Sequence, residues 1–184
     1  MGCQQRRHPP LVAQIDVAAT AVLARLYAGR VMCVAEAPSP QRDLQTSYQR
    51  GRPMPILRGA TSKAILAALP ARRRDKVFAS CGLAQGPERD RLLTDLDRIR
   101  KRGVSVTRGE VDPGLVGIAV PVRNAGLGIH ASVSFVLSAD DVTDARERRM
   151  SALLTAHARL IETYMQDAYE AVEASSTKQD HHPQ

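Results

Sequence analysis

Residues 103–138 constrain the fold of this chain more than any other stretch. They hold a short β-rich run, a polar turn around Pro113-Gly114, and two long apolar runs joined by a Gly-rich turn. Successive β-rich runs separated by turn residues predict neighbouring strands of one sheet. Small or hydroxyl-bearing residues interrupt the apolar ones at Thr107, Gly117, Ser132 and Ser134. Because a buried polar group is costly without a partner, this pattern favours a small-molecule pocket on the sheet over a plain apolar core.

The remaining residues predict a further hairpin and several helices. The hairpin is predicted for 20–27 and 31–36, and the long connection at 41–58 is predicted to contain a short strand near 44–48. Helices are predicted at 10–18, 60–69, 70–80 and 87–102, and from Asp141 or Thr143 to about Val172. Hairpins combined with helices indicate an α+β domain. Its predicted limits are 10–172, with a flexible leader at 1–9 and a disordered tail at 173–184.

Composition limits the class of protein. At 184 residues, 43% of them hydrophobic, the chain suits one folded domain. No apolar run approaches the roughly 20 residues that a membrane span needs, and the first ten residues lack the apolar core of a secretory signal. The three cysteines, Cys3, Cys33 and Cys81, are far apart, which argues against a disulfide framework or a structural zinc site. We therefore expect a cytoplasmic protein with no metal, no cofactor and no membrane partner.

The net charge of +7 is concentrated between residues 71 and 110, which hold eleven basic and six acidic side chains. One interpretation is a nucleic-acid surface, and the other is the solvated face of two amphipathic helices. We favour the solvated face, because the segment contains no recognisable nucleic-acid-reading motif and no set of aromatic residues that would stack on bases.

Three stretches resemble one known family. The first is Leu26-Tyr-Ala-Gly-Arg-Val-Met-Cys-Val-Ala-Glu36 with the connection to Leu57, and the second is Ala60-Thr-Ser-Lys-Ala-Ile-Leu-Ala-Ala-Leu-Pro70. The third and most specific lies within 99–122 and includes Gly109-Glu-Val-Asp-Pro-Gly-Leu-Val-Gly-Ile-Ala-Val-Pro-Val122. Together they resemble the C-terminal effector-binding domain of the IclR family of bacterial transcriptional regulators. The resemblance implies a GAF-like fold, in which a six-stranded antiparallel sheet with helices binds a small metabolite, often a carboxylate, in a cleft.

The resemblance also implies where that ligand binds. The family's ligand-contacting positions correspond here to a set that we call the cradle: Ala60, Thr61, Thr107, Gly117, Ser134 and Val136. Backbone N–H groups at the start of the helix at 60–69 would attract an anion, and Ser134 supplies a hydrogen-bond donor. Gly117 and Val136 replace more polar residues of the family, so one end of the cradle is expected to be apolar. A cradle without room for a three-carbon acid would contradict this prediction.

Three functions remain open from the sequence. The first is a non-catalytic sensor that binds a small-molecule effector within a homodimer or tetramer. Only a few residues precede the domain where the family has a winged helix-turn-helix, so we expect no direct DNA binding by this chain. The second is a dimerisation module without ligand, which would use the apolar stripe at 143–172 or the basic face. The third is a small hydrolytic enzyme using Cys81, Glu110 or His130. It needs a nucleophile–base pair that the sequence does not display, so we expect no catalytic residue.

Several of these residues also have a purely structural interpretation. Ser132 and Ser134 alternate with apolar residues, so one set faces the pocket and the other a helix layer, and a buried serine also bonds readily to the backbone. Thr107 would then cap its strand. Glu110 and Asp112 precede Pro113-Gly114, and acidic residues beside a turn are commonly structural. His157 lies on the apolar stripe of the last helix, where a core or interface role is simplest.

Overall fold

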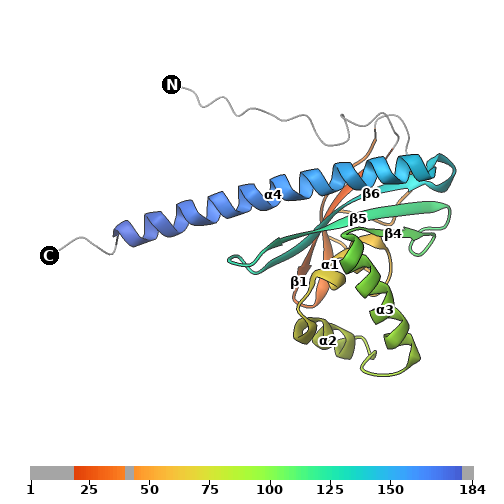
Figure 1. Ribbon diagram of the computed structural model, residues 1–184, viewed down its shortest axis with the longest axis horizontal. Coiled ribbons are helices and arrows are strands. Elements are labelled where there is room, and N and C mark those ends of the chain that lie inside the picture. The colour runs from red at the N-terminus through yellow and green to blue at the C-terminus, as the bar shows by residue number, and fades with distance from the viewer. Residues whose placement is uncertain (1–18, 40–43, 180–184) are drawn as a thin grey trace.

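The computed structural model describes residues 19–39 and 44–179. Within these residues, six antiparallel strands form one sheet in the order β3-β2-β1-β6-β5-β4 (Figure 1). The strands are β1 (Thr20–Tyr27), β2 (Arg30–Ala37), β3 (Pro53–Met54), β4 (Ser105–Arg108), β5 (Leu115–Asn124) and β6 (Ile129–Ser138). Pairing of β1 with β6 joins the first hairpin to the last one. The predicted α+β class and six-stranded antiparallel sheet are confirmed.

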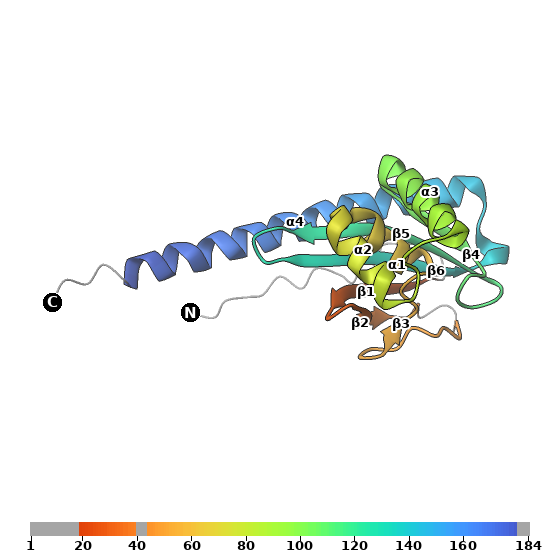
Figure 2. The same ribbon diagram turned by 90° about the horizontal axis from the view of Figure 1, so that it is seen from below.

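Helices cover both faces of this sheet (Figures 1 and 2). On one face lie α1 (Ala60–Ala68), α2 (Ala71–Ser80) and α3 (Pro87–Arg102), and along the other runs α4 (Asp144–Gln179), which follows the 3-10 turn η2 (Ala139–Asp141). The end signals of α3 operate as expected, because Pro87 occupies its first turn and Gly103 follows its last residue with a φ of 74°. Among the described helices, none has an apolar run long enough to cross a membrane.

Some predicted boundaries differ from the structure. The strand predicted near 44–48 is wrong, because those residues form no strand and the edge strand β3 pairs instead with Val31 and Met32 of β2. Helix α4 continues to Gln179, beyond the predicted end near Val172, and no Gly or Pro lies between them to stop it. The predicted helix at 10–18 and the leader at 1–9 lie outside the described residues.

Alternate residues of β6 face two different helix layers. Ala131, Val133, Phe135 and Leu137 pack with β5 and with Met150 and Leu154 of α4 to form the main hydrophobic core. The intervening residues Ser132 and Ser134 face α1, where both contact Thr61. This division is the one that the alternation of serine with apolar residues predicts, because successive side chains of a strand point to opposite faces.

Helix α1 packs unusually close to β5 through small side chains. Ala60 and Ala64 are fully buried against Ala119. At Gly117, an added Cβ atom would lie 3.1 Å from the Cβ of Ala60, which is tighter than an ordinary side-chain contact. The missing side chain at 117 therefore lets the first turn of α1 rest directly on the sheet.

Candidate functional site

The six cradle residues converge where the start of α1 packs on the sheet. Ala60 and Thr61 are the first two residues of that helix. Thr107 of β4, Gly117 of β5 and Val136 of β6 form one row across the sheet, because Gly117 is paired with both of the others. Thr61 Oγ1 and Ser134 Oγ share a hydrogen bond of 3.0 Å in the buried layer between helix and sheet. Tertiary structure thus brings together residues that come from four elements.

The first backbone N–H groups of α1 are bonded to side chains of this chain. The N–H of Ala60 donates to Thr107 Oγ1 at 3.0 Å, and the N–H of Gly59 donates to Glu110 Oε2 at 2.9 Å. Thr107 therefore caps the N-terminus of α1 from the neighbouring strand β4, instead of capping its own strand. The start of α1 holds a carboxylate, as expected for a helix N-terminus, and that carboxylate belongs to Glu110.

The loop between β4 and β5, residues 109–114, closes over the cradle. Val111 lies against Gly59, where an added Cβ atom would come within 2.6 Å of Val111 Cγ2. Asp112 accepts a hydrogen bond from the Ser47 N–H at 3.0 Å and another from the Ser47 hydroxyl. These contacts hold the loop against Gly59, the residue before α1, and against the connection that precedes β3.

The closed loop leaves almost no free volume. The space among Tyr48, Thr107, Glu110, Gly117 and Val136 is about 10 Å³, which is roughly what one water molecule requires. A three-carbon acid does not fit, so the predicted open cleft is absent from this conformation. The close approach of Ala60 to Gly117 and the docking of loop 109–114 are the physical reasons.

A buried lysine holds the loop to the helices. Lys63 of α1 is 8% exposed, and its Nζ donates to Asp95 Oδ2 at 2.7 Å and to Glu110 Oε1 at 2.8 Å. Burial by itself lowers the pKa of Lys63. The hydrogen bonds and charges of both carboxylates outweigh that effect and raise the pKa above its ordinary value. Glu110 therefore joins α1 and α3 through Lys63 while it bonds to the N–H of Gly59.

Comparison with known proteins identifies the family. The sequence model of the bacterial transcriptional regulator IclR C-terminal domain matches residues 12–163. The chain belongs to this family. This IclR C-terminal domain is 29% identical to the C-terminal domain of a transcriptional regulator from Vibrio cholerae, with a TM-score of 0.70 over 85% of this chain and 98% of that one. No curated protein matches the chain.

Two further structures share the fold of this IclR domain. The C-terminal domain of the E. coli transcriptional regulator KdgR is 24% identical, with a TM-score of 0.66 over 80% of this chain and 87% of that one. The IclR protein of Thermotoga maritima is 20% identical, with a TM-score of 0.72 over 84% of this chain and 63% of that one. This chain thus spans slightly under two thirds of the Thermotoga protein.

Candidate catalytic residues of this IclR domain lie in separate places. Cys81 lines a surface pocket with Arg30 and Met54, whereas Glu110 is engaged by Lys63 and Gly59. His130 of β6 bonds through Nε2 to Arg73 of α2. Within the described residues, no group of three His, Cys, Asp or Glu side chains could hold a metal ion. The nucleophile–base pair that hydrolysis needs is not formed by these three candidates.

Sequence reasoning missed two residues that shape the cradle. Tyr48 is 5% exposed, and its burial raises its pKa although a hydrogen bond with Thr61 acts in the opposite direction. Asp95 of α3 is the second carboxylate that accepts a hydrogen bond from Lys63. No local pattern marks these residues, because each meets its partner across the fold.

Other residues follow the structural interpretation. Ser132 Oγ donates to the carbonyl of Thr61 at 3.0 Å, and His157 Nδ1 is bonded to the carbonyl of Leu153 at 2.9 Å within α4. The acidic residues Glu110 and Asp112 are engaged in tertiary bonds that hold the turn. The polar atoms of Ser132 and His157 named above therefore have hydrogen-bond partners without a ligand.

Proposed function

We propose that this IclR C-terminal domain senses a small carboxylate metabolite, which binds in the cradle at the start of α1. The observation that carries the proposal is the bond between the Gly59 N–H and the Glu110 carboxylate. A helix start that accepts one carboxylate has the geometry and the charge to accept another. Glu110 then acts as an internal competitor for the ligand.

Binding would require loop 109–114 to move away from α1. The incoming carboxylate would replace Glu110 at the Gly59 N–H, while the hydroxyls of Thr61 and Ser134 would orient its polar substituents. The row formed by Gly117 and Val136 would face the apolar part of the ligand. Because the ligand binds only the open arrangement, it would shift the equilibrium from the closed conformation to the open one.

The test replaces the internal competitor. Glu110→Gln removes the negative charge of the side chain that accepts a hydrogen bond from the Gly59 N–H. The affinity for pyruvate or another small carboxylate should therefore rise about tenfold or more, which is equivalent to the free energy of one charge-assisted hydrogen bond. Titration calorimetry measures the affinity, with pyruvamide as the neutral ligand control. Glu36→Gln, which changes an exposed carboxylate on β2, is the matched protein control. Ser134→Ala should weaken binding.

Two results would reject this proposal. One is a folded Glu110→Gln protein whose affinity for every tested carboxylate equals that of the unchanged chain. The other is a Ser134→Ala protein that binds as well as the unchanged one. A circular dichroism spectrum of each variant establishes that the fold is retained.

Self-association is a second candidate function. Leu160, Tyr164 and Val172 of α4 are large apolar side chains that are 53%, 62% and 66% exposed. Leu160 and Tyr164 are four residues apart and therefore share one face of the helix. We propose that this face joins two copies in a homodimer, or in one of the interfaces of a tetramer. Sedimentation velocity should show dissociation for Tyr164→Glu but not for the exposed control Gln166→Glu, and an unchanged mass would reject this interface.

A further inference from the structure

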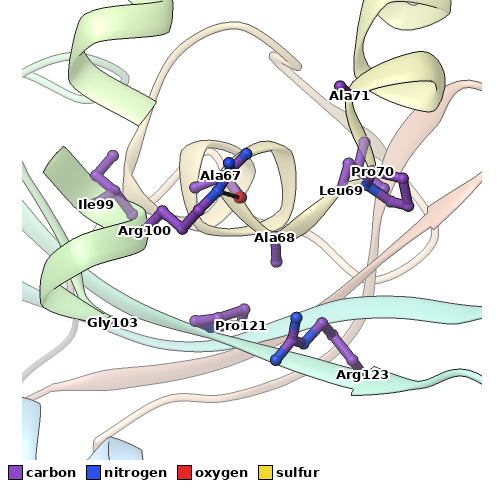
Figure 3. Close-up of a pocket in the computed structure, with 10 residues that line it drawn as sticks. All are labelled: Ala67, Ala68, Leu69, Pro70, Ala71, Ile99, Arg100, Gly103, Pro121 and Arg123. Atoms are coloured by element: carbon purple, nitrogen blue, oxygen red, sulfur yellow. Dashed lines mark hydrogen bonds between the residues drawn. The ribbon is translucent and has the colours of Figure 1, made fainter. Parts of the chain in front are cut away.

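A groove lies at the opposite end of α1 from the cradle (Figure 3). It is formed where α1 ends, α2 begins, α3 ends and β5 passes beneath them. Its volume is about 450 Å³, which is within the range of sites that hold small organic molecules. Apolar walls come from Ala67, Leu69, Pro70, Ile99 and Pro121.

Two arginines enter this groove from different elements (Figure 3). Arg100 of α3 is held in place, because its Nε donates to the carbonyl of Ala67 at 3.0 Å. Arg123 of β5 uses its backbone N–H to bond to Glu162, whereas no hydrogen bond or ion pair of its guanidinium is found among the described residues. The groove therefore presents one anchored guanidinium and one that is available to a ligand.

The positive charge of the groove is only partly matched, since Arg100 Nη1 lies 4.0 Å from Asp97 Oδ1 on α3. No Asp or Glu is among the described residues that line it. Arg73 Nη1 lies 2.7 Å from His130 Nε2. In the antiparallel pairing of β5 with β6, His130 lies opposite Arg123. Burial lowers the pKa of His130, and the nearby charges of Arg73 and Arg123 lower it further.

A buried arginine that does not line the groove lies on α2, the helix whose first residue, Ala71, does line it. Arg74 is 8% exposed, and its Nε and Nη1 atoms have no hydrogen-bond partner among the described residues. A charge buried without a counter-charge is costly. The carbonyl ends of α1 and α3 offset part of the positive field, but each such end carries only about half a unit charge, and Arg100 already neutralises one of them.

We propose that this groove binds an organic anion whose carboxylate or phosphate is held by Arg123 and Arg100 and whose apolar body contacts Leu69, Ile99 and Pro121. The planar guanidinium fork suits both anionic groups. The site is separate from the cradle and does not depend on the function proposed above. Its volume admits a larger ligand than the closed cradle does.

The experiment uses 2-naphthoate and 2-naphthyl phosphate as probes, with 2-naphthamide as the neutral analogue. Calorimetry on the whole chain gives the affinity, and the side-chain Nε–H signal of Arg123 in a nitrogen-edited NMR spectrum reports the location. Arg123→Gln and Arg100→Gln should each weaken binding of the anions about tenfold or more, the equivalent of a lost charge-assisted hydrogen bond. Arg98→Gln makes the same charge change on an exposed part of α3 and should have no effect.

Each other outcome overturns the proposal. Equal weakening by Arg98→Gln would show a non-specific charge effect, and equal binding of 2-naphthamide would show that the arginines select nothing. Absence of binding by both anions at millimolar concentration would show that there is no site. Ser134→Ala should leave naphthoate binding unchanged, and a loss there would place the probe in the cradle. All four variants alter side chains without a role in the core formed by β5, β6 and α4 on the other face, and urea denaturation confirms that each is folded.

Discussion

Removal of the ammonium group of Lys63 should destabilise the fold by about 2 kcal/mol. In Lys63→Met the apolar stem is retained, and the two hydrogen bonds of Nζ to Asp95 and Glu110 are lost. Breaking a fully buried ion pair on one side costs about 3–5 kcal/mol. The cost is smaller here, because the side chains of Asp95 and Glu110 are 40% and 32% exposed and regain water.

Urea denaturation followed by circular dichroism measures this loss. The midpoint should fall with no change in the slope of the unfolding free energy against urea, because the exposed surface of the unfolded chain is unaltered. The melting temperature should fall by roughly 4–8 °C for a chain of this size. Lys101→Met removes an exposed lysine of α3 and serves as the matched control, with an expected change of less than about 0.5 kcal/mol.

A double-mutant cycle separates the ion pair from other effects of the substitution. Lys63→Met, Glu110→Gln and the double variant should give a coupling energy between about 0.5 and 3 kcal/mol. A Lys63→Met protein as stable as the unchanged chain would refute the reasoning, since it would show that desolvation of the lysine cancels both bonds. A coupling energy of zero would show that Glu110 does not depend on Lys63.

Two further predictions follow from the same geometry. Gly117→Ala should lower the free energy of unfolding by about 1 kcal/mol, because the new Cβ atom would lie 3.1 Å from the Cβ of Ala60, and fully buried alanines hold α1 in place there. A higher free energy of unfolding in this variant would show that α1 moves freely. For His130, the pKa is lowered in the folded state, so its contribution to stability is full above the unfolded pKa of 6.5 and is lost as the pH falls below it. His130→Gln should reduce that loss in urea titrations between pH 7.5 and pH 5, measured against the unchanged chain, and identical pH profiles would contradict the assignment.

Periodic and local signals explain the parts of the fold that could be predicted. The alternation around Ser132 and Ser134 defined the two faces of β6, and Pro87 and Gly103 marked the ends of α3. The two-residue strand β3 could not be predicted, because its pairing with β2 is a tertiary event with almost no local pattern. The six cradle residues do meet at the start of α1, but the closed conformation has no room for a three-carbon acid, so their role as ligand contacts stays a prediction for an open conformation.

By itself, the sequence determined the α+β class, the two faces of β6 and the ends of α3, because these depend on apolar periodicity and on the backbone preferences of neighbouring residues. Only the tertiary structure decided the state of the cradle. Glu110 reaches the Gly59 N–H, and Lys63 reaches Asp95, across gaps in sequence that no local pattern spans. The start of α1 can face either a carboxylate of the chain itself or open space. Which of the two it faces depends on how closely loop 109–114 and Gly117 let the helix approach the sheet.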